Sequence, residues 1–144
     1  MSIFLGIFGP GPNPSACFLS KGKILFWAEE ERFTRIKTSP NSFPFSAINA
    51  GLKYLSITPN DIIAVGYAWD CIDYSSASLS NLESTLARYP SSSDNLNRLA
   101  QDAINLRYNP EIISSRLSSF FARVGRTIPL PIHFYPHHLS HAYS

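Results

Sequence analysis

The first 28 residues carry the pattern that most constrains the fold: three short apolar runs separated by chain-breaking residues. The runs cover residues 3–8, 15–19 and 24–28, and each has the length of a buried strand. Residues 9–14 read GPGPNP, so the chain leaves the first run in a tight, proline-rich loop. A short turn containing Gly22 joins the second run to the third, which is typical of a β-hairpin. The chain is therefore predicted to begin as strand, loop and hairpin.

A helix followed by a strand is predicted next. Apolar residues at 43, 47, 48, 52 and 55 recur at helical spacing, and Pro44 fits an early helical position. Residues 58–61 break this pattern, and residues 62–69 form an apolar, β-branched and aromatic run typical of a strand. Strand, helix and strand in this order indicate a mixed sheet with a right-handed crossover. The predicted fold class is therefore α/β.

Residues 73–126 are rich in serine and contain no strand-like run, so we predict a helical insertion of two or three helices there. Apolar stripes mark helices within 79–86, 96–106 and 113–124, and the last is framed by Asn109 and Gly125. A final strand is predicted over 128–135, although its two prolines cannot donate to a ladder. The organisation expected is one unit, 1–144, in which a strand core of 1–72 and 127–144 carries the insertion.

Composition excludes several classes of function. The 144 residues are 44% apolar and carry a net charge of only +2, which fits one globular domain and gives no reason to expect nucleic acid. The apolar N-terminus is too short for a signal peptide or a membrane span, so a cytoplasmic protein is expected. Cys17 and Cys71 lie far apart in apolar, strand-like settings and are predicted to be buried, reduced thiols.

All four histidines lie between His133 and His141. Pro136 is well placed to open a helix, on which His137 and His141 would project from one face as half of a divalent-metal site. An ordinary helix start remains the alternative, whereas a zinc-protease helix is disfavoured because His138 stands where that motif needs Glu. The sequence stops three residues after the pair, so we expect the N-terminal piece of a longer protein.

Two polar segments are candidates for binding an anion. Backbone N–H groups of Asn13, Ser15 and Ala16 could face a phosphate, but the neighbouring prolines have no N–H, and a rigid turn is the alternative. Residues 29–37 read EEERFTRIK, in which three carboxylates balance three cations. That cluster is interpreted either as a solvated strand end with surface ion pairs, or as an active-site loop in which Lys37 is a mobile charge for phosphate.

Three stretches, in this order and spacing, resemble the N-terminal domain of the O-carbamoyltransferases of the nodulation-factor and aminoglycoside-antibiotic type. Residues 11–17 read GPNPSAC and resemble the family's loop of His-Asp/Asn-x-Ser-Ala. Residues 28–37 read AEEERFTRIK and are close to a long family signature, with Phe-Pro at 43–44 where the family has it. Residues 137–142 read HHLSHA and are similar to the family's histidine motif. The resemblance covers essentially this whole chain but only the first part of a family member.

The resemblance implies an actin-like, sugar-kinase-like (RNase H-like) fold, close to the metalloprotein that transfers threonylcarbamoyl to tRNA. A C-terminal adenylate-forming domain, missing here, would make carbamoyl-adenylate from carbamoyl phosphate and ATP, and the N-terminal domain would pass the carbamoyl group to a hydroxyl of a small-molecule acceptor. His137 and His141 would be ligands of a divalent metal, iron, whose third ligand is an aspartate beyond residue 144. Lys37, with Asn13 and Ser15, would contact the nucleotide or its phosphate.

The first motif departs from the family at the position of its histidine. The family's histidine falls on Pro12 and its acid on Asn13, and proline has no group that can accept a proton. No histidine precedes His133 in the sequence. The alternative function is therefore a catalytically silent nucleotide-binding relative that acts as a binding or regulatory subunit. Under either function we expect residues 1–144 alone to be inactive and to expose an apolar face.

Overall fold

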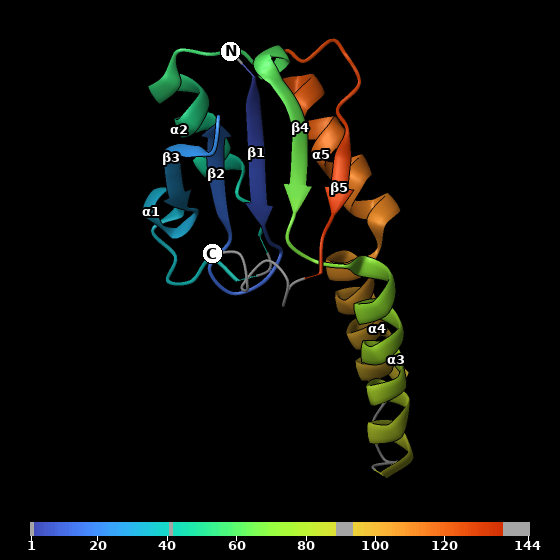
Figure 1. Ribbon diagram of the computed structural model, residues 1–144. Helices are drawn as coiled ribbons and strands as arrows, with labels where there is room; N and C mark the ends of the chain where they lie inside the picture. The colour runs from blue at the N-terminus through green and yellow to red at the C-terminus, as the bar shows by residue number, and fades with distance from the viewer. Residues whose placement is uncertain (1, 41, 89–93, 137–144) are drawn as a thin grey trace.

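A computed structural model describes residues 2–40, 42–88 and 94–136, which form an α/β fold with a five-stranded mixed sheet (Figure 1). The prediction of this fold class is confirmed. In chain order the elements are β1 (Ile3–Phe8), β2 (Ser15–Ser20), β3 (Lys23–Glu29), α1 (Glu31–Thr34), α2 (Phe45–Leu55), the 3-10 helix η1 (Pro59–Asp61), β4 (Ile62–Tyr67), α3 (Cys71–Arg88), α4 (Asp94–Tyr108), α5 (Pro110–Arg123) and β5 (Ile132–Phe134).

The strands lie side by side in the order β3-β2-β1-β4-β5. β2 is antiparallel to both β1 and β3, whereas β1, β4 and β5 are parallel. Four strands therefore run in one direction, and the carboxyl ends of β1, β3, β4 and β5 meet at one edge of the sheet, the lower edge in Figure 1. We call this the carboxyl edge. The predicted opening of strand, loop and hairpin is confirmed.

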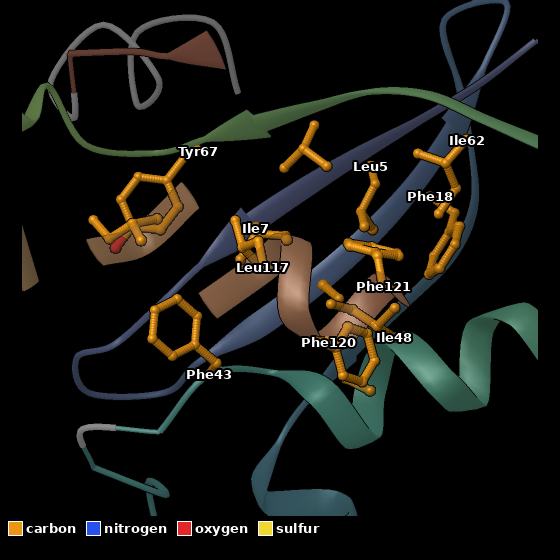
Figure 2. Close-up of a cluster of buried hydrophobic side chains, with 14 of the residues drawn as sticks. Leu5, Ile7, Phe18, Phe43, Ile48, Ile62, Tyr67, Leu117, Phe120 and Phe121 are labelled. Carbon is orange, nitrogen blue, oxygen red and sulfur yellow. The ribbon is translucent and has the colours of Figure 1, made fainter. Parts of the chain in front are cut away.

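One face of the sheet is covered by α2 and α5. Alternate residues of each strand point to this face, because strand side chains alternate between the two sides of a sheet. Figure 2 shows side chains from the strands meeting side chains of the two helices in one buried cluster. The fully buried members include Ile3, Leu5, Phe18, Ile48, Ile62, Val65, Tyr67, Ile113 and Leu117.

The three long helices divide into two groups. α3 and α4 pack on each other and project as a hairpin beyond the carboxyl edge (Figure 1). α5 instead contributes Ile113, Leu117, Phe120 and Phe121 to the core of the sheet. Its predicted start is confirmed: the Asn109 side chain accepts hydrogen bonds from the N–H groups of residues 111 and 112, and proline follows at the first helical position.

Three local predictions are corrected. α3 begins at Cys71, well before the apolar stripe at 79–86, so the strand-like setting predicted for that cysteine is wrong. β5 begins only at Ile132, because prolines at 129 and 131 cannot donate to the ladder, and the predicted strand start at 128 is wrong. The short helix α1 occupies part of the charged cluster at residues 29–37, for which a strand end or a loop is predicted.

A buried arginine fixes the approach to β4 and β5. The Arg126 guanidinium donates to the carbonyl oxygens of Ile62, Ile128 and Pro129 at 2.9 Å each, and also to that of Pro59. Burial lowers the pKa of Arg126 from its ordinary value. These four carbonyls lie at the start of β4 and just before β5, so one side chain holds the two strands in register at the end opposite the carboxyl edge.

Within the described ranges, every helix is too short or too polar to cross a lipid bilayer.

Gly51 is expected to be required for the packing of α2 on the sheet. A Cβ at this position would overlap the fully buried ring of Phe18, although alanine is the better helix former. Gly51→Ala should therefore lower the free energy of unfolding by about 1–3 kcal/mol, as overpacking does. Lys53→Ala, on the exposed side of the same helix, is the matched control and should change it by less than about 0.5 kcal/mol. Urea denaturation measures both; equal stability of Gly51→Ala and the parent would contradict this packing.

Candidate functional site

The carboxyl edge brings together segments that are far apart in the sequence. The loop 9–14 follows β1, residues 30–39 follow β3, and residues 135–136 follow β5 (Figure 1). Two backbone hydrogen bonds join the first two segments: Asn13 N–H donates to the Thr38 carbonyl at 3.0 Å, and Glu30 N–H donates to the Pro14 carbonyl at 2.8 Å. The first two motifs of the sequence are therefore in direct contact.

Glu30 is the buried centre of this arrangement. The residue is only 3% exposed. Its two carboxylate oxygens point at the N-terminus of α2. One oxygen accepts the Ser46 N–H at 3.0 Å and the other accepts the Ala47 N–H at 2.8 Å. These N–H groups have no partner within the helix, and the helix dipole adds attraction for a negative charge. The interpretation of residues 29–37 as a solvated strand end with surface ion pairs is therefore wrong for Glu30.

The other charged side chains of residues 29–37 either lie at the surface or form hydrogen bonds within the loop. Arg32 forms exposed ion pairs with Glu29 at 3.4 Å and with Glu31 at 3.6 Å, which are worth little energetically. The other oxygen of Glu31 accepts the Thr38 N–H at 2.7 Å. This bond closes residues 31–38 into a compact loop, which the hydroxyl contact between Thr34 and Ser39 tightens further.

The structure places the predicted phosphate contacts on or near this loop. Lys37 is exposed, so its ammonium group is free to reach a ligand at the carboxyl edge. Asn13 is also exposed and adopts a left-handed backbone with φ of 54°, which asparagine tolerates well. Its N–H is already bonded to Thr38, so only its side chain remains for a phosphate. Ser15 is half-buried at the start of β2, and Pro12 is exposed.

The predicted metal ligands His137 and His141 lie outside the described residues. The described chain leads up to them at the carboxyl edge, where Tyr135 N–H donates to the Tyr67 carbonyl at 2.9 Å. In the described part of the chain, no three His, Cys, Asp or Glu side chains gather closely enough to hold a metal. The metal prediction for the histidine pair stays a prediction.

The two cysteines are free thiols, as predicted, but only Cys71 is fully buried; the burial predicted for Cys17 is wrong, because Cys17 is half-buried. Burial raises the pKa of Cys17, and burial together with the negative charge of Asp70 raises that of Cys71 to about 12. A nucleophilic cysteine needs the opposite shift, because the thiolate is the reactive form. Neither thiol is therefore activated for covalent catalysis at neutral pH.

A hollow on the sheet was not anticipated from the sequence. Gly6 and Gly66 are partners across β1 and β4, and beside them the ring of Tyr135 lies 3.4 Å from where a Cβ of Gly66 would be. Together with Ser15 and Cys17 they line a cavity of about 330 Å³ that opens near the carboxyl edge. The available signal was a glycine inside each of two apolar strands, which often marks a close approach by another group.

A search against models of known protein families finds no match for this chain. Assignment to a family therefore depends on the three motifs and on the geometry that unites the first two of them.

Glu30 is expected to act as a structural carboxylate that holds the motif loop on α2. Glu30→Gln should lower the free energy of unfolding by about 1–3 kcal/mol. The N–H groups of Ser46 and Ala47 each bond to a separate carboxylate oxygen, whereas the Gln amide has only one acceptor oxygen. Glu29→Gln is the matched control; its carboxylate makes only an exposed ion pair, so the expected change is below about 0.5 kcal/mol. Thermal or urea unfolding gives both values. Equal losses in the two variants would show that the buried cap is energetically unimportant.

Proposed function

We propose that this chain is the acceptor-side, N-terminal part of a cytoplasmic O-carbamoyltransferase. The observation that carries the proposal is the contact between the first two motifs at the carboxyl edge, where Glu30 N–H bonds to the Pro14 carbonyl. Sequence motifs that resemble a family's active-site loops are expected to meet in space if they act on one ligand. The third motif follows Pro136 in the sequence, and its own residues lie outside the described part of the chain.

We also propose that the sheet belongs to the actin-like, RNase H-like class. The strand order β3-β2-β1-β4-β5, with β2 as the antiparallel member, supports this assignment. Ligands of open α/β sheets bind outside the carboxyl ends of the strands, and that is where Lys37, Asn13 and Ser15 lie. Fold alone does not establish a function, so the proposal depends on the residues at this edge.

In the proposed reaction the acceptor's hydroxyl oxygen attacks the carbamoyl carbon of carbamoyl-adenylate. The bond from that carbon to the phosphate oxygen breaks, AMP leaves, and the hydroxyl proton passes to a base. Lys37 would hold the phosphate and offset the charge that develops on it as the bond breaks. The Glu30 and Glu31 hydrogen bonds would keep the loop that carries Lys37 in place.

Two imidazoles four residues apart are a donor set that suits a divalent transition metal such as iron. In this proposal His137 and His141 hold that metal, which when bound supplies positive charge near the phosphate. The base is a group other than residue 12, because Pro12 has nothing to accept a proton. Carbamoyl phosphate, ATP and a small-molecule acceptor are the proposed substrates of the whole protein, and its adenylate-forming domain would follow this part of the chain. No nucleic-acid partner is proposed.

A second candidate function is a catalytically silent, nucleotide-binding relative that serves as a binding or regulatory subunit. The exposed pyrrolidine ring of Pro12, in place of the family's histidine, favours it. The two candidates differ in turnover but not in binding, so one experiment separates them.

The complete product of the gene is expected to form AMP from ATP when carbamoyl phosphate, ferrous iron and a hydroxyl-bearing acceptor are present together. Lys37→Ala should lower this rate about 100-fold, because one phosphate-facing charge is lost where charge develops. Its thermal stability should be unchanged, since Lys37 is exposed. Lys53→Ala, an exposed lysine on α2, is the matched control and should retain full activity.

Three results would decide between the candidates. Iron and ATP binding without AMP formation over a broad set of acceptors would favour the silent subunit. A protein that binds neither would overturn both candidates. Loss of iron binding in His137→Ala and in His141→Ala, measured by metal analysis, would support the metal assignment separately from turnover.

A further inference from the structure

The proposed reaction needs a group that accepts the proton of the acceptor's hydroxyl. Residue 12, where the family has a histidine, is proline, and the residue after it is an uncharged asparagine. A general base must be deprotonated at the working pH and must lie within hydrogen-bond reach of the hydroxyl. The base is therefore expected among the deprotonated side chains near the loop 9–14 at the carboxyl edge.

Several titratable side chains of this edge are unsuited to the role. The buried Glu30 carboxylate is bonded to the start of α2, and the Glu31 carboxylate accepts the Thr38 N–H. Glu29 forms an exposed ion pair at the end of β3, a strand that β2 separates from β1. Burial raises the pKa of Cys71 to about 12, so its thiol stays protonated at neutral pH.

The loop after β4 supplies a further carboxylate, that of Asp70, which lies between the end of β4 and the start of α3. The imidazole of the described residues, His133, is placed differently. It lies on β5 opposite Gly66, within the sheet and not in a loop of the carboxyl edge. Asp70 is therefore the better candidate for a base that acts in these loops.

Asp70 lies beside the loop in which the family's histidine is replaced. β4 is the parallel neighbour of β1, so the chain after β4 leaves the sheet next to the loop 9–14 (Figure 1). The Ala68 N–H donates to a carbonyl oxygen of β1 at 3.1 Å, which continues the ladder beyond β4. One residue further, the ring of Trp69 has its centre 5.7 Å from that of Phe8, the last residue of β1. Asp70 follows directly.

Contacts with α4 hold the same segment from its other side. The rings of Trp69 and Tyr108 meet edge to face, with their centres 5.5 Å apart. The hydroxyl of the fully buried Tyr67 donates to the Arg107 carbonyl at 3.3 Å. Asp70, itself half-buried, is thus carried by a segment that is fixed between β1 and the end of α4. A group held in place before the reaction needs little reorganisation during it.

We propose that Asp70 is the general base of the transfer step and that the acceptor's hydroxyl lies between Asp70 and the loop 9–14. This inference rests on the proposed function. As the hydroxyl oxygen bonds to the carbamoyl carbon, its proton passes to a carboxylate oxygen of Asp70. The bond from that carbon to the phosphate oxygen breaks, and AMP leaves with its electron pair. Water then takes the proton from the carboxylic acid, which restores the carboxylate.

Asp70→Asn removes the proton acceptor while keeping the size of the side chain. In the complete product of the gene it should lower acceptor-dependent AMP formation at least about 100-fold, as loss of a general base does. Exchange of pyrophosphate with ATP, measured with carbamoyl phosphate and without acceptor, should be unchanged, because formation of the adenylate does not use Asp70. Asp102→Asn removes the same charge from an exposed position of α4 and should retain the parent rate.

Chemical rescue separates proton transfer from a structural role. Asp70→Ala leaves room for a small carboxylate, so added formate should raise AMP formation by this variant about tenfold. Formate should not raise AMP formation by Lys37→Ala, which lacks a phosphate contact and not a base.

The results separate failure of this inference from failure of the proposed function. Parent-level AMP formation in Asp70→Asn would overturn the inference alone. A loss of pyrophosphate exchange as large as the loss of AMP formation would do the same, because Asp70 would then support the fold or the adenylate site. Equal effects of formate on Asp70→Ala and Lys37→Ala would also remove the role as base. Absence of AMP formation by the parent protein would overturn the proposed function, and the assignment of Asp70 with it.

Discussion

The buried carboxylate of Glu30 is the interaction on which the carboxyl edge depends. A carboxylate removed from water is costly unless hydrogen bonds replace its hydration, and two N–H groups at the start of α2 provide them. The same residue's backbone N–H is bonded to Pro14 in the loop after β1. One residue thus joins the end of β3, the start of α2 and the first motif. The loop that carries Lys37 is attached to this point by Glu31 and Thr38.

The direction of the strands explains both the candidate site and the exposure of one face of the sheet. Because four of the five strands run the same way, the loops that follow them converge on one edge and bring the first two motifs together. Because both crossovers step in the same direction, their helices cover one face and leave the other exposed. The exposure of Phe4, Ile24 and Trp27 is thus a consequence of topology, and the expectation of an exposed apolar face is met in the described residues.

Sequence patterns predicted local structure well where the relevant interactions are short-range. The hairpin around Gly22 and the cap of α5 at Asn109 depend on residues that are neighbours in the sequence. Prediction failed for Glu30, because a charged cluster looks alike whether its carboxylate is solvated or bonded to Ala47, seventeen residues away. The prediction also missed the first turns of α3, because the apolar stripe that indicates this helix begins only at residue 79. The Gly6–Gly66 hollow was missed because it exists only once β1 and β4 pair.

The sequence by itself determined the order of the five strands and the long helices, the breaks between them, and the spacing of the three motifs at residues 11–17, 28–37 and 137–142. Those features depend on side-chain type, local backbone preference and spacing, all of which are present before folding. Only the tertiary structure decided that the loops at residues 9–14 and 30–39 touch, that Glu30 is buried, and that one sheet face is open. These facts depend on strand direction and on contacts between distant residues, because burial and the partners of a charge are properties of the packed chain.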